Sequence, residues 1–183
     1  MLQTKQHNPD KYLQKIKVRK DDVFFIPPGC VHSVGAGIVL AEIQENSDVT
    51  YRLYDYDRID KEGHKRELHI NKAMEVLDMN ACSAPRQPMR TLRYEPGCAT
   101  ELLCRCRYFQ VERKMIAQTG EGILFKSEEQ SFQILLCIQG KGKVKTAGTA
   151  GEFALQKGEC LFVPAGDYTF GVTGHLTVLQ IRC

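Results

Sequence analysis

A short pattern occurs twice in this chain, and it limits the folds that the chain can adopt. The first copy is residues 22–29 (DVFFIPPG) and the second is residues 159–166 (ECLFVPAG). In each copy an acidic residue precedes four apolar residues that suit a β-strand, and a proline and a glycine then favour a turn. Gly37 and Gly174 also occupy matching positions. A recurring unit of this kind predicts two related β-domains.

The second half of the chain has the pattern of short β-strands almost throughout. Closely spaced strands with Gly-rich turns between them favour an antiparallel barrel or sandwich. Gly140-Lys141-Gly142 is expected to form a tight hairpin turn. The expected strands are residues 101–107, 109–116, 132–139, 142–146, 151–155, 160–163, 168–172 and 176–181.

The first half predicts fewer strands, together with one or two short helices. Ile70, Met74 and Leu77 fall at helical spacing, which indicates a helix near residues 71–78. Asn8 and Pro9 suit the start of a second short helix. The expected strands are residues 23–26, 38–44 and 50–54. The predicted domains are residues 1–79 and 91–183, and residues 80–90, with two prolines, form a linker.

Composition argues against several classes of function. The 183 residues carry a formal net charge of +3, and scattered basic residues do not favour nucleic acid or an anionic membrane as partner. The first 20 residues are too polar for a signal peptide, and no apolar run approaches the roughly 20 residues of a membrane helix. We therefore interpret the eight cysteines as reduced thiols of a cytoplasmic protein.

His32 is the candidate metal ligand. It ends the sequence Pro27-x-Gly29-x-x-His32 after an apolar strand, where a rigid turn fixes the direction of the imidazole. A lone histidine in a turn is also commonly just solvated, and a catalytic zinc site needs three or four protein ligands. In the second copy of the repeat the matching residue is Thr169, which does not replace an imidazole. Only the first domain is therefore expected to bind a metal.

A second group of candidates follows on the next expected strands. Asp48 and Arg52 are four residues apart, so a regular strand places both on one face, and Glu42 and Gln44 share their parity. An aspartate and an arginine on one face can simply pair with each other. Alternatively, the arginine holds anionic oxygens through paired donors, and the aspartate orients it or moves protons. The sequence leaves both interpretations open.

The chain resembles the class I mannose-6-phosphate isomerases of the short bacterial type, which belong to the cupin superfamily. The resemblance rests on the strand–PxGxxH–strand order and on residues 41–58 (AEIQENSDVTYRLYDYDR). It is strongest over residues 23–77 and returns at residues 106–109, 131–135 and 161–166.

This resemblance implies a function and the roles of individual residues. The family is zinc-dependent and interconverts mannose 6-phosphate and fructose 6-phosphate through an enediol. His32 matches the last zinc-ligand histidine, Arg52 the catalytic arginine and Asp48 the active-site aspartate. Arg52, Glu42 and Gln44 are then expected to line the pocket for the sugar phosphate.

The resemblance also implies that parts of the family's site lie outside this sequence. The Gln-x-His pair and the glutamate that complete the zinc site precede the matching region, and Gln6-His7 has the wrong spacing to replace them. We expect an incomplete first cupin barrel with open sheet edges and a complete, degenerate second one. Alone, such a chain is expected to bind zinc weakly and show little activity, unless an N-terminal partner chain or a homodimer supplies ligands. The alternatives are a non-catalytic phosphosugar-binding module and a truncated remnant without function.

Overall fold

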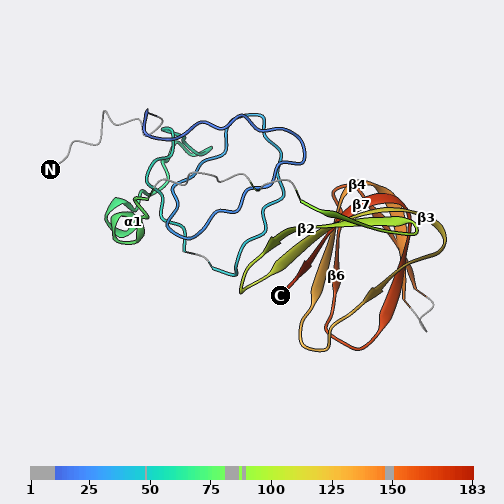
Figure 1. Cartoon of the computed structure of the whole chain (residues 1–183). Helices are drawn as coiled ribbons and strands as arrows, with labels where there is room; N and C mark the ends of the chain where they lie inside the picture. The colour runs from blue at the N-terminus through green and yellow to red at the C-terminus, as the bar shows by residue number, and fades with distance from the viewer. Residues whose placement is uncertain (1–10, 48, 81–86, 88–89, 147–150) are drawn as a thin grey trace. The chain divides into compact units, whose positions relative to one another are not determined.

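The computed structural model describes residues 11–47, 49–80, 87, 90–146 and 151–183 (Figure 1). The chain divides into two compact units, Met1–Gln87 and Pro88–Cys183. The described residues contain one α-helix and seven β-strands, and every strand pairing between them is antiparallel. The predicted fold class, mainly antiparallel β-structure, is therefore confirmed. No helix in these ranges has the length and apolar character needed to cross a membrane.

The second unit is a seven-stranded antiparallel sheet that curves around one interior (Figure 1). Its strand order is β1-β2-β3-β7-β4-β5, and β6 pairs with β4. The two longest pairings are those of β7 with β3 and with β4. The strands are β1 (Leu92–Glu95), β2 (Cys98–Arg105), β3 (Gln110–Lys126), β4 (Gln133–Thr146), β5 (Glu152–Gln156), β6 (Cys160–Val163) and β7 (Thr169–Arg182).

Apolar side chains fill the interior of the second unit. Alternate residues of β4 are buried, as the period of two in a strand requires, and Leu135 and Cys137 are fully inaccessible. The rings of Phe125 and Phe170 stack with their centroids 5.3 Å apart. Two buried polar side chains pair with each other, because Gln180 donates a hydrogen bond to Gln133 at 2.8 Å. The interior is thus a packed core.

The glycines of β4 serve a close approach of two strands, and the predicted hairpin turn at Gly140-Lys141-Gly142 is wrong. β4 continues through these residues, with an irregularity in its pairing between Cys137 and Gln139, and pairs with β7, so that Gly142 lies opposite Gly174. A Cβ atom at Gly140 would collide with the backbone oxygen of His175, and one at Gly142 with that of Thr173. Glycine inside a strand often marks such an approach, and the sequence alone does not distinguish it from a turn.

The first unit contains no β-strand among its described residues, so the strands predicted at residues 23–26, 38–44 and 50–54 are wrong. A strand forms only where a neighbour satisfies its backbone groups, and the described part of this unit supplies an isolated bridge between Ile59 and Lys65. Many apolar side chains here are exposed, including Val39 at 98%. Local strand propensity is present, but in the described residues it leads to single bridges and not to paired strands.

The predicted helix near residues 71–78 is confirmed as α1 (Ile70–Val76). Its buried residue is Ala73, whereas Met74, expected on the apolar face, is 61% exposed. In the described part of the first unit only Ala73 and Asp55 are buried. Asn8 and Pro9, the expected start of a second helix, lie outside the described residues.

Candidate functional site

The segment from Arg52 to His69, here called the 52–69 loop, folds back on itself in the first unit. At its base, His69 donates its backbone N–H to the carbonyl oxygen of Arg52 at 2.8 Å. In return, the backbone N–H of Arg52 donates to Nδ1 of His69 at 3.2 Å. Near the tip, Asp60 donates its N–H to the carbonyl oxygen of His64 at 2.9 Å. Hydrogen bonds therefore join the two sides of the loop at its base and near its tip.

Arg52 is held by this loop at its backbone and at its side chain. Its side chain is 23% exposed, and its Nη1 donates to the carbonyl oxygen of Glu67 at 3.1 Å. Its Nε lies 4.0 Å from Oδ1 of Asp55. Because contacts fix both the backbone and the guanidinium, the direction of the positive charge is defined.

Asp55 is the centre of the charged groups in the loop. Arg66 donates from Nε to Oδ2 at 2.8 Å and from Nη2 to Oδ1, which is a two-pronged contact. Arg58 donates from Nη2 to Oδ1 at 2.6 Å. The hydrogen bonds from Arg66 lower the pKa of Asp55 to about 2, with a further contribution from Arg58, while burial acts in the opposite direction. The carboxylate is therefore ionised at neutral pH.

His32 is exposed, and the turn that carries it is anchored to the end of α1. The backbone N–H of Asp78 donates to the carbonyl oxygen of Gly29 at 3.0 Å. Gly29 has φ of +83°, and a Cβ atom there would lie 2.6 Å from the backbone oxygen of Val76. Nδ1 of His32 is 2.9 Å from the carbonyl oxygen of Cys30. A carbonyl only accepts, so this contact places a proton on Nδ1, and in the neutral ring Nε2 keeps the lone pair that a metal ligand requires.

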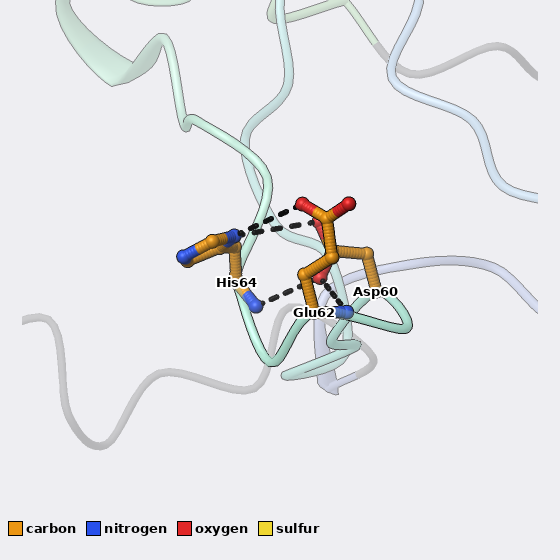
Figure 2. A group of neighbouring side chains, drawn as sticks. All are labelled: Asp60, Glu62 and His64. Atoms are coloured by element: carbon orange, nitrogen blue, oxygen red, sulfur yellow. Dashed lines mark hydrogen bonds and ion pairs between the residues drawn. The ribbon is translucent and has the colours of Figure 1, made fainter.

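The described residues do not form a zinc site around His32. The group of potential ligands that they do bring together is Asp60, Glu62 and His64, all exposed (Figure 2). Oδ1 of Asp60 already accepts the backbone N–H groups of Glu62 and His64, at 2.9 Å each, so this cluster is accounted for by the turn at the loop tip. At the predicted metal position the described chain offers a single imidazole, and zinc requires three or four protein ligands.

Two other predicted site residues, Glu42 and Gln44, make no hydrogen bond or ion pair with Arg52 in the described structure. Glu42 and Gln44 are exposed, and Asp48 lies outside the described residues. Within the described ranges, no hydrogen bond or ion pair connects His32 with Arg52, Glu42 or Gln44.

Sequence reasoning missed Asp55 and His69, which contact Arg52 in the structure. Their signal in the sequence was weak, because both occur in a charged stretch that is typical of a surface loop. Arg52 and Arg58 each lie three residues from Asp55, but Arg66 is eleven residues from it, and no local pattern in the sequence links these two. Only the folding back of the loop brings these side chains together.

Comparisons with known proteins agree over most of the chain. Residues 99–182 match the family model for the cupin domain of mannose-6-phosphate isomerase. The chain is 36% identical to the mannose-6-phosphate isomerase ManA of Bacillus subtilis over 171 residues, which are 91% of this chain and 50% of that protein. It is 52% identical to the probable mannose-6-phosphate isomerase GmuF of the same species over 159 residues, 86% of this chain and 48% of that one.

A solved structure supports the same fold. The crystal structure of the mannose 6-phosphate isomerase from Bacillus subtilis matches with a TM-score of 0.60 and 27% sequence identity. The match covers 75% of this chain and 41% of that one. The chain thus spans about half the length of the curated relatives it matches.

Proposed function

Because this chain belongs to the mannose-6-phosphate isomerase family, we propose that it supplies part of the active site of an aldose–ketose isomerase. The substrate is mannose 6-phosphate and the product is fructose 6-phosphate. The observation that carries this proposal is the fixed position of Arg52. Its guanidinium donates to the carbonyl oxygen of Glu67, and its backbone exchanges two hydrogen bonds with His69.

The proposed reaction moves a proton between the two adjacent carbons C1 and C2 of the sugar through an enediol. Arg52 holds the anionic oxygens of the substrate, because a guanidinium stays charged and offers several donors in one plane. Such a preoriented charge stabilises negative charge that develops on oxygen. Asp48 orients Arg52 or transfers the proton, and Glu42 and Gln44 contact the sugar.

In the same proposal His32 is one ligand of a zinc ion, through Nε2. The described residues do not complete that site, and in this proposal an N-terminal partner chain or a second copy of this chain in a homodimer supplies the remaining ligands. Zinc bound there would polarise the substrate oxygens. The location that fits this metabolic activity is the cytoplasm.

The proposal is tested by following fructose 6-phosphate formation from mannose 6-phosphate by the purified chain with added zinc. Arg52→Ala is the test variant, and Arg93→Ala, which changes an exposed arginine of β1, is the control. Turnover that disappears in Arg52→Ala and persists in Arg93→Ala supports the proposal. Turnover no higher than that of Arg52→Ala shows that this chain is not an isomerase by itself.

A binding measurement separates the second candidate function from the first. The exposed segment around Glu42 and Gln44 and the fixed Arg52 also suit a phosphosugar-binding module without turnover. Mannose 6-phosphate binding that persists in the presence of a zinc chelator, without product formation, would favour that function.

A further inference from the structure

We propose that Asp55 is a positioning residue that sets the place of Arg52 by locking the two arms of the 52–69 loop together. The first arm carries Arg52, Asp55 and Arg58, and the second arm carries Arg66, Glu67 and His69. The inference rests on the proposed function in one respect, namely that Arg52 contacts the substrate. Asp55 is the one carboxylate that is buried among the described residues of the first unit, with its side chain 7% exposed. A buried carboxylate is costly unless it is paired, so its retention there calls for partners.

The partners of Asp55 come from both arms of the loop. On the first arm, Arg58 donates to the side-chain Oδ1 at 2.6 Å and from Nε to the backbone oxygen of Asp55 at 3.3 Å. On the second arm, Arg66 reaches both carboxylate oxygens with its fork. The two-pronged contact fixes the direction as well as the distance between the arms.

The lock at Asp55 controls Arg52 through the residues that follow Arg66. Glu67, the next residue, provides the carbonyl oxygen that accepts the Nη1 donor of Arg52 at 3.1 Å. His69, two residues farther on, exchanges two hydrogen bonds with the backbone of Arg52. If the second arm moves away from Asp55, the acceptor at Glu67 and the clamp at His69 move with it.

The positive charges around Asp55 make it possible to tell a positioning role of Asp55 from a purely electrostatic one. Three guanidinium groups, those of Arg52, Arg58 and Arg66, lie within 4.0 Å of one carboxylate. Removal of the negative charge would raise the positive potential and tighten the binding of an anionic sugar phosphate, if charge alone mattered. If Asp55 positions Arg52, the same change weakens binding. The two explanations therefore predict opposite signs.

The test compares Asp55→Asn with Asp57→Asn in the full chain. Asp57 is 73% exposed and pairs with Lys65 on the other arm, so its variant makes the same charge change and removes an exposed ion pair between the arms, while the contacts of Asp55 stay in place. Calorimetry gives the affinity for mannose 6-phosphate, and NMR gives the Nε–Hε signals of the arginines without any ligand.

We expect Asp55→Asn to lower the affinity for mannose 6-phosphate about tenfold, as loss of a charge-assisted hydrogen bond commonly does. The Nε–Hε signals of Arg52 and Arg66 should shift and exchange faster with solvent. Asp57→Asn should keep the arginine signals and bind at least as tightly as the unmodified chain. Asp55→Glu, which retains the charge, should recover part of the affinity.

Unchanged signals of Arg52 in Asp55→Asn would overturn the proposal, and so would tighter binding by this variant. If the unmodified chain binds no mannose 6-phosphate, the proposed function fails, and the arginine signals still decide whether Asp55 positions Arg52. If Asp55→Asn does not fold, Arg66→Lys replaces it, because lysine keeps the charge and lacks the fork. A signal of Arg52 that stays in place in Arg66→Lys would equally refute the lock.

Discussion

Truncation of Leu135 measures whether the interior of the second unit is a packed core or a space that a ligand can enter. Leu135 lies in β4, has no exposed surface and belongs to a cluster of twelve buried residues. Leu135→Ala removes three carbon atoms, and at about 0.8 kcal/mol for each buried methylene the transfer term alone is about 2.4 kcal/mol. The cavity left by a closely packed site adds to this, so we expect a loss of about 3–4 kcal/mol.

The assay is urea unfolding of the full chain followed by the signal of the β-sheet. With a slope of about 1–3 kcal/mol per molar urea, the expected loss lowers the midpoint of the second unit by roughly 1–4 M. Leu124→Ala in β3 is the matched control, because the same truncation at a side chain that is 74% exposed should cost less. Its expected loss is below about 0.5 kcal/mol. Equal losses in the two variants would refute a packed interior.

Three further predictions concern the crossing of β4 and β7, the acid titration of Asp55 and the metal. Gly142→Ala should lower the free energy of unfolding by about 1–3 kcal/mol in urea titrations, because its Cβ meets the backbone oxygen of Thr173, whereas Gly120→Ala, with open space around it, should not. The side-chain carboxyl signal of Asp55 should titrate near pH 2. The folded pKa lies below the unfolded pKa of about 3.9. The contribution of Asp55 to stability is therefore full above the unfolded pKa and is lost as the pH falls toward 2. A midpoint near the unfolded value would contradict the contacts with Arg58 and Arg66. Zinc should leave the purified chain on dialysis, since one imidazole holds it weakly, and metal analysis showing one retained ion per chain would disprove this.

The strands of the second unit were predictable because their signal is local. Local strand patterns identified β5 and β6 nearly as they occur, β2 was predicted three residues too late, at 101–107, and the longer strands β4 and β7 were each predicted as two pieces. In β4 and β7 the predicted breaks fall at Gly140 and Gly174, where the backbones approach closely, and β3 was predicted only over residues 109–116, so its second half was missed. β1 was not predicted, and all four of its residues are exposed, so it carries no alternation. Contacts between strands, not propensity, decide these cases.

The candidate site was only partly predictable, for a different reason. Resemblance identified His32 and Arg52, since a motif keeps its residues together in the sequence. The lock at Asp55 depends on Arg66, which is eleven residues away along the loop. Such a contact becomes visible only when the loop is folded. The strands predicted in the first unit were wrong because pairing, too, is a non-local property.

The most direct test of the proposed function is the rate of fructose 6-phosphate formation by the chain and by Arg52→Ala at equal concentration, with added zinc and with the missing ligands supplied by a partner chain or a second copy. The account predicts product formation by the unmodified chain in the presence of the missing ligands, from a partner chain or a second copy, and its loss in Arg52→Ala. Equal rates for the two proteins under those conditions would contradict the role assigned to Arg52.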